Sequence, residues 1–179
     1  PVGGNTGTTV GQQRLIAFEE ATAIWGELLD TPVEIRVRAT FDPLPCTADE
    51  GALGGASPDT VVSDSPNAPL AGTWYPAALA SRLAGEDVDP SSDDIVARFN
   101  SDIGQADCLE GSGWYYGLDG AHGDSFDLVT VLLHQLAAVR IPPVQADLPE
   151  LPDIAEAHFS AVGQLEDEAD VRILRALGR

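Results

Sequence analysis

The residue with the clearest chemical potential is His134, which opens the run His-Gln-Leu-Ala-Ala inside an apolar stretch. A zinc-peptidase helix needs two imidazoles four positions apart, so that both bind one Zn²⁺ from the same face. It also needs a carboxylate directly after the first imidazole, to take a proton from the metal-bound water. Here Gln135 is no base near neutral pH, and Ala138 has no ligand atom. His134 therefore has two interpretations, a zinc ligand or a buried histidine satisfied by hydrogen bonds.

The helix that positions His134 is predicted to begin near Ser125 or Asp127 and to run to Val139. Its apolar residues lie almost all round, so we expect it to be buried. Pro142 and Pro143 end it, because a proline lacks the N–H donor and disfavours helical geometry just before it.

The other predicted elements give a mixed order of helices and strands. A capping box formed by Thr9 and Gln12 predicts a helix that ends at Thr31-Pro32. Alternating apolar and polar residues predict strands over 33–41 and 94–100. The remaining elements are a long excursion over 42–73 with a short strand near 60–62, a short helix over 74–83, and, after a Pro-rich linker, two helices over 153–165 and 166–177. This order predicts an α+β domain and not a regular parallel α/β sheet.

Five stretches resemble a family of secreted bacterial zinc metallopeptidases of the zincin type, which often carry a protease-associated domain. In that family the active-site helix typically continues as HELAHGLGF. The stretches cover much of residues 1–137 in a consistent order, and they are PVGGNTGTTVGQQRLIA (1–17), FDPLPCT (41–47), DIVARFNSDIGQ (94–105), CLEGSGWYYGLD (108–119) and DLVTVLLHQLA (127–137).

The resemblance implies that His134 matches the first zinc ligand, Gln135 the catalytic Glu, and Ala138 the lost second ligand. It implies a zincin-like domain over 1–141, with a small mixed sheet and a buried active-site helix, followed by a linker and helical tail over 142–179. Zinc is the family's cofactor, and with these replacements we expect little or none to be bound by this chain. Losing a general base alone costs about 10²–10⁴-fold in rate.

Three functions follow as expectations. The first is a secreted metallopeptidase-like protein without activity that binds a peptide or protein along an edge strand carrying Ile95, Ala97 and Phe99. The second is a secreted zinc endopeptidase in an inactivated or altered form. The third is a structural or binding subunit of an extracellular assembly.

The charge balance excludes several partners. Asp and Glu total 29 against nine basic residues, all of them Arg, and the net charge is −20. Phosphate backbones and anionic membranes are repelled by such a surface, which argues against nucleic-acid binding. No apolar run is long enough to predict a membrane span.

The cysteines Cys46 and Cys108 have neither CxxC nor zinc-knuckle spacing, and each lies in a Pro- or Gly-rich setting. One disulfide, and with it an oxidising compartment, is the favoured interpretation; two unpaired thiols are the alternative. The start at Pro1 agrees with a processed secreted protein or with a trimmed chain.

Weaker candidates remain. His122 is either a loop or helix-cap residue or a metal ligand, and His158 is a still weaker metal candidate. Asp124 or Ser125 is expected to cap the helix that follows, in preference to Ca²⁺ binding by the neighbouring aspartates Asp119, Asp124 and Asp127. Two further groups are read as structural: a solvated acidic turn with Asp87, Asp89, Asp93 and Asp94, and aromatic anchors at Trp114, Tyr115 and Tyr116.

Overall fold

The computed structural model describes residues 1–29, 31–138, 160–161, 170–172 and 174–175. This part of the chain forms a small α+β fold with three helices, α1 (Val10–Leu28), α2 (Ala77–Ala84) and α3 (Leu128–Ala138). The strands are β1 (Val37–Asp42), β2 (Gly54–Pro58), β3 (Val61–Ser63), β4 (Trp74–Pro76), β5 (Ile95–Asn100), β6 (Trp114–Tyr115), β7 (Phe126–Asp127), β8 (Ser160–Ala161), β9 (Asp170–Arg172) and β10 (Leu174–Arg175).

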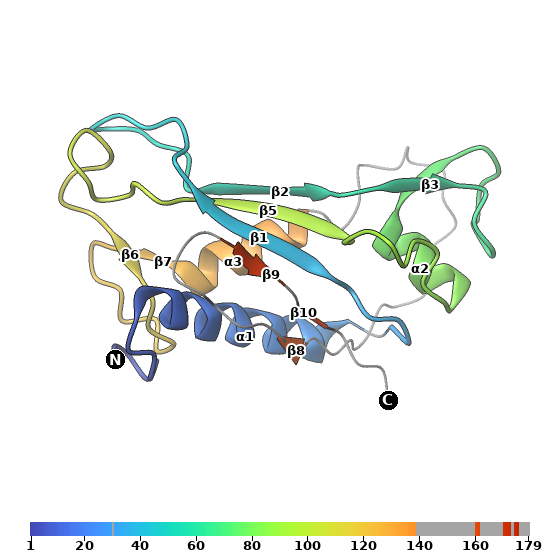
Figure 1. Cartoon of the computed structure of the whole chain (residues 1–179), viewed down its shortest axis with the longest axis horizontal. Helices are drawn as coiled ribbons and strands as arrows, with labels where there is room; N and C mark the ends of the chain where they lie inside the picture. Colours follow the sequence, from blue (N-terminus) through green and yellow to red (C-terminus); the bar gives the residue numbers. More distant parts are fainter. Residues whose placement is uncertain (30, 139–159, 162–169, 173, 176–179) are drawn as a thin grey trace.

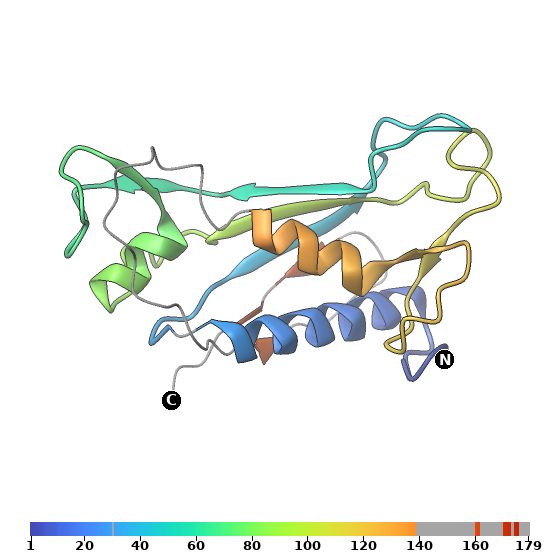
Figure 2. The ribbon, with the colours of Figure 1, turned by 180° about the vertical axis from the view of Figure 1, so that it is seen from behind.

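A four-stranded mixed sheet in the order β2-β5-β1-β9 forms the centre. β1 and β5 run parallel, with Val37 opposite Ile95, whereas β2 is antiparallel to β5 and β9 is antiparallel to β1. Helices α1 and α3 cover the same face of this sheet, as Figures 1 and 2 show from opposite sides. The described part of the chain thus has two layers, a sheet and a helical layer that covers one of its faces.

The core lies between the sheet and these two helices. β1 alternates buried and half-buried residues, because one face of the strand meets the helices and the other faces outward. Ala17, Phe18 and Ala21 of α1 are fully buried, as are Leu128 and Leu132 of α3. The Phe18 ring meets the Phe99 ring edge to face, with centroids 5.5 Å apart, and this contact joins α1 to the sheet.

Helix α1 begins where the sequence predicts. The Thr9 side chain accepts a hydrogen bond from the Gln12 N–H, and the Gln12 side chain bonds back to the Thr9 backbone. This reciprocal capping satisfies N–H groups that the first helical turn leaves without partners. The helix ends at Leu28, shortly before the predicted stop at Thr31-Pro32.

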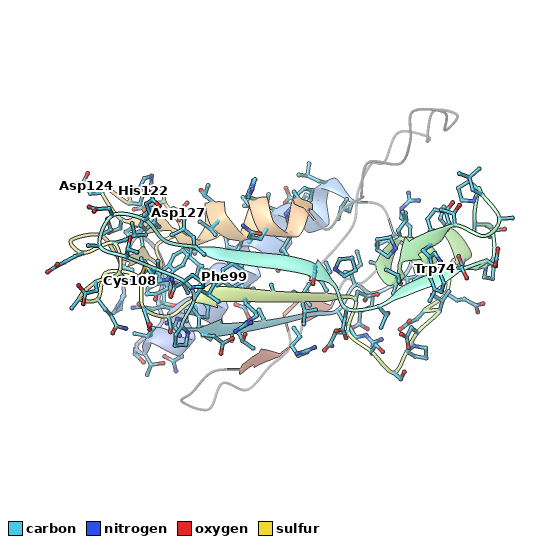
Figure 3. The ribbon with its side chains drawn as sticks, turned by 90° about the horizontal axis from the view of Figure 1, so that it is seen from above. Trp74, Phe99, Cys108, His122, Asp124 and Asp127 are labelled. Atoms are coloured by element: carbon cyan, nitrogen blue, oxygen red, sulfur yellow. A yellow bond between two sulfur atoms is a disulfide. The ribbon has the colours of Figure 1, made fainter. Side chains whose placement is uncertain are left out.

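Two smaller groups of elements extend from the ends of the sheet. At one end β3 and β4 form an antiparallel ribbon beside α2, and at the other β6 pairs with β7 (Figure 1). Cys108, which forms a disulfide with Cys46, lies at the same end as Asp127 of β7 (Figure 3). The Asn100 side chain joins the disulfide loops, since it donates to the Ala52 carbonyl and accepts from the Leu44 and Asp102 N–H groups. The disulfide confirms the favoured pairing.

Several predicted elements need correction. β5 lies between β2 and β1, so the expectation that Ile95, Ala97 and Phe99 form an edge strand is wrong: these side chains are buried in the core. The segment predicted as a helix from Trp74 starts as a strand, because Trp74–Pro76 pairs with β3 before α2 begins.

The predicted helical tail is also wrong at the residues described. The described residues of this range, 160–161, 170–172 and 174–175, lie in the short strands β8, β9 and β10 and not in helices: β9 pairs with β1, and β8 pairs with β10. The predicted linker, the segment 139–141 and His158 lie outside the described residues.

Candidate functional site

Helix α3 brings His134 to the surface. Leu128, Val129, Leu132 and Leu136 are buried, whereas Thr130 and His134, four positions apart on one face, are exposed. The interpretation of His134 as a buried histidine is therefore wrong. The helix packs against the core through its leucine face, and the face that carries Thr130 and His134 is exposed to solvent. Gln135 is half-buried beside it.

The start and the middle of α3 are held by specific hydrogen bonds. Asp127 Oδ2 accepts from the N–H and the hydroxyl of Thr130, so Asp127 is the capping residue, and not Asp124 or Ser125 as predicted. Trp25 Nε1 on α1 donates to the Leu133 carbonyl at 3.3 Å, which ties the two helices together. The position of His134 is thus set by a helix that is capped at its start and hydrogen-bonded to α1.

Strand β2 is the element of the sheet that lies against α3 (Figure 2). Among the described residues, β2 pairs only with β5, so its other side is an open edge. A free edge presents unpaired N–H and C=O groups that can pair with another extended chain. The open edge and the helix that carries His134 are therefore neighbours.

The hydrogen bonds at the two ends of β2 show which backbone groups face the open edge. The Asn100 N–H donates to the Leu53 carbonyl at 2.9 Å, and the Asp59 N–H donates to the Asp94 carbonyl at 3.1 Å. Since bonding alternates along an antiparallel pair, residues 53, 55, 57 and 59 face β5. Gly54 and Ala56 then direct an N–H and a C=O outward, and Pro58 directs a carbonyl only.

A glycine at position 54 is required by close packing. A Cβ there would lie 2.8 Å from both the Arg98 carbonyl oxygen and Cδ1 of Phe99. The strand can therefore approach the Phe99 ring only without a side chain at that point. Close packing thus accounts for the glycine at position 54 of this edge strand, whose sequence GGASP carries none of the usual β-branched residues.

The donor set around α3 does not fit a zinc ion. A catalytic zinc site needs three protein ligands, and the helix offers one imidazole with Ala138 at the second position. In the part of the chain that the structure describes, no three His, Cys, Asp or Glu residues are gathered so that they could hold an ion.

The loop candidates before α3 have local partners. His122 Nδ1 lies 2.8 Å from the Ser125 carbonyl, and Asp119 accepts from the Tyr115 hydroxyl and the Ala121 N–H. Figure 3 shows His122, Asp124 and Asp127 at the same end of the molecule as Cys108. Hydrogen bonds within the loop thus account for His122 and Asp119 without a ligand.

Trp114 anchors this end of the molecule. Its indole N–H donates to the Asn100 carbonyl at 2.7 Å, and its ring packs edge to face against Phe41 and Phe126. The prediction of a structural anchor agrees with this arrangement.

The acidic turn before β5 is not simply a solvated surface. Asp94 is only 4% exposed, and its Oδ2 accepts a hydrogen bond from the Arg36 N–H at 2.7 Å. Asp87 pairs with the Arg36 guanidinium, and Asp93 pairs with that of Arg38. The turn is therefore fastened to the start of β1, and the prediction of a fully solvated turn is wrong for Asp94.

Burial is the main reason that the pKa of Asp94 rises to about 6; the charges of Asp87 and Asp93 raise it further, while the Arg36 N–H bond opposes the rise. The folded state then binds a proton more tightly than an unfolded chain, in which the pKa is near 3.8. Ionised Asp94 consequently weakens the fold, increasingly as the pH rises from about 4 to above 6.

Replacing Asp94 with Asn should therefore stabilise the protein at pH 8, by about 2 kcal/mol, and change little at pH 4. The amide oxygen can still accept from the Arg36 N–H, and no charge remains to be desolvated. Urea unfolding at both pH values measures this difference. Glu86→Gln on the exposed part of the turn is the matched control and should change stability little at either pH; an Asp94→Asn gain that grew on acidification would contradict the assignment.

No model of a protein family matches this chain, and no curated protein or solved structure matches it. Among the described helices, none combines the length and the apolar character needed to cross a bilayer. The relation to zinc metallopeptidases accordingly stays a prediction from the sequence stretches quoted above.

Proposed function

We propose that this chain is a secreted, metallopeptidase-related scaffold that binds an extended polypeptide along β2 and does not hydrolyse it. The observation that carries the proposal is the open edge of β2 beside the helix that bears His134. Main-chain hydrogen bonds give such an edge affinity for a peptide strand whatever its sequence. The disulfide is consistent with an oxidising, extracellular setting.

The lack of hydrolysis follows from the residue types on α3. Gln135 has no basic lone pair to take a proton from water near neutral pH, and Ala138 cannot complete a metal site. His134 remains as an exposed imidazole, able to donate or accept one hydrogen bond to a bound chain. The side chains of His134, Gln135 and Ala138 are therefore suited to contact with a bound peptide and not to its hydrolysis.

Ala56→Pro tests the binding part of the proposal. The proline removes the outward N–H at position 56 but no bond of the β5 ladder, since Ala56 faces away from β5 in the alternation. We expect binding of a capped, fluorescein-labelled hexapeptide of alternating Thr and Val to weaken about tenfold, because a lost main-chain bond is worth about 1 kcal/mol and the ring blocks close approach. Fluorescence anisotropy measures the affinity.

Ala56→Val is the comparison variant: the Ala56 side chain packs against the core, so Val adds bulk on that side and keeps the outward N–H. Equal weakening by the Val and Pro variants would show that disturbed packing and not edge pairing matters. Peptide binding that is unchanged in Ala56→Pro would contradict the edge site.

The bound hexapeptide should be recovered intact, by mass spectrometry, after incubation with the unmodified protein and added Zn²⁺. Cleavage, or zinc near one equivalent in the purified protein, would contradict the non-hydrolytic assignment. The double variant Gln135→Glu, Ala138→His is the matched comparison. If it gains zinc and peptidase activity, the rest of a catalytic shell is intact and the chain is an altered endopeptidase; if it gains neither, the scaffold interpretation is supported.

A further inference from the structure

The β3–β4 ribbon exposes large apolar side chains at the end of the molecule far from the disulfide. Trp74 is 64% exposed, Val61 50% and Leu70 43%. Figure 3 places Trp74 at the opposite end from Cys108 and Asp124. The only other large apolar side chains with comparable exposure in the described residues are Val10 and Leu28, at the two ends of α1. The ribbon is therefore where exposed apolar surface is concentrated.

Val61 and Trp74 share one face of the ribbon. Val61 lies opposite Pro76 and Ser63 lies opposite Trp74, so Val61 and Trp74 are diagonal neighbours across the two strands. Tyr75, the next residue, points to the other face and is 4% exposed. We call the exposed pair Val61 and Trp74 the ribbon face; Leu70 lies in the loop that connects the strands.

The connecting loop is held in one shape. Asp64 Oδ1 accepts from the Gly72 N–H at 2.7 Å, Asn67 Nδ2 donates to the Leu83 carbonyl at 3.0 Å, and the Leu70 N–H donates to the Tyr75 hydroxyl at 3.2 Å. Asp64 and Asn67 have φ angles of 54° and 61°, a conformation that costs non-glycine residues about 1 kcal/mol or more each. A ribbon fastened in this way presents its face without the entropy loss of ordering a loop on binding.

Charge decides which occupant fits the ribbon face. The segment 59–94 holds seven acidic residues and one basic residue, Arg82, in a chain of net charge −20. Asp59, Asp87 and Asp93 pair with Arg36 and Arg38, and Asp94 is buried, so the negative charge of this segment comes mainly from Asp64, Glu86 and Asp89. Asp64 and Glu86 within it are exposed. A second copy of this chain, a nucleic acid or an anionic membrane would meet repulsion, whereas a cationic polypeptide would be attracted.

The chemistry of Trp74 agrees with the same occupant. An indole face is the best aromatic acceptor for an Arg or Lys cation, and a basic side chain also brings an apolar stem that can cover Val61. We propose that the ribbon face binds a positively charged, partly apolar segment of a partner polypeptide, with a basic side chain seated over the Trp74 ring. This site is separate from the β2 edge and does not depend on the function proposed for it.

A capped octapeptide of alternating Leu and Arg, labelled with fluorescein, tests this site on the full chain. Trp74→Ala should weaken its binding at least tenfold in fluorescence anisotropy, Trp74→Phe should weaken it less, and raising the salt concentration from 50 to 500 mM should weaken it in the unmodified protein. Leu28→Ala, on the exposed end of α1, is the matched control and should leave the affinity unchanged.

Two comparison peptides separate the parts of the proposal. Alternating Ser and Arg keeps the charge without the apolar side chains, and alternating Leu and Glu reverses the charge; both should bind at least tenfold more weakly. Equal binding by either peptide, or an affinity unaffected by Trp74→Ala, would overturn the proposal. So would concentration-dependent self-association in sedimentation equilibrium that Trp74→Ala removes, because the occupant would then be a second copy. Circular dichroism checks that each variant is folded.

Discussion

Replacing Phe99 with Ala should lower the free energy of unfolding by about 3–5 kcal/mol. The side chain is fully buried on β5, meets Phe18 of α1 edge to face, and lies 5.5 Å from the Phe41 ring on β1. Gly54 of β2 approaches the same ring closely. Truncation would thus leave a cavity between β5, β1, β2 and α1. Urea unfolding measures the resulting loss of stability.

Val96→Ala is the matched control for that experiment, because Val96 lies on the same strand but faces outward and is only half-buried. It should cost about 1 kcal/mol or less. Phe99→Leu retains most of the volume and keeps the comparison measurable if the alanine variant does not fold. Equal losses for Phe99→Ala and Val96→Ala would show that the core is not centred on this ring.

The core elements could be predicted because their local signals agree with their environment. The capping box at Thr9 sets the start of α1, and the alternation in 94–100 follows from a strand with one buried face. The strand predicted over 33–41 is confirmed from Val37 on, whereas residues 33–36 lie outside β1. The pairing of Cys46 with Cys108 followed from their loop settings and the absence of any metal-binding spacing. For the helix and the strands the pattern lies within a few residues of the feature it predicts, and two cysteines allow only one pairing within the chain.

The edge of the sheet could not be predicted, because it depends on contacts between distant segments. β2 has no β-branched residue, and a side chain at Gly54 would collide with Arg98 and Phe99, which come more than 40 positions later in the chain. Because no strand was predicted at 54–58, β5 was expected to be the edge strand. Pairing order is a tertiary property that alternation alone does not encode.

The exposure and the contacts of the candidate site residues could not be predicted from the sequence either. An apolar helix such as α3 gives no sign of which face stays exposed, so a buried histidine was one of the two interpretations of His134, whereas the leucine face packs and His134 is exposed. Asp94 looked like one more residue of an acidic turn, but the turn folds back onto Arg36 and buries it. A run of aspartates in the sequence shows only that the segment is acidic. Which of these side chains is buried depends on the fold.

Removing the disulfide by Cys46→Ala and Cys108→Ala should lower the free energy of unfolding by about 4 kcal/mol. The bridge closes a loop whose ends are 62 positions apart, and in the chain-entropy account a loop of this length restricts the unfolded ensemble by about that amount. The loop contains β2, β3, β4, α2 and β5, so both the open edge and the ribbon face lie on the restrained segment. Thermal and urea unfolding with and without dithiothreitol measure the effect: the reductant should destabilise the unmodified protein and leave the double variant unchanged. Unfolding of the unmodified protein that is insensitive to the reductant, after mass spectrometry has shown the thiols to be reduced, would mean that hydrogen bonds such as those of Asn100 hold these loops without the bridge.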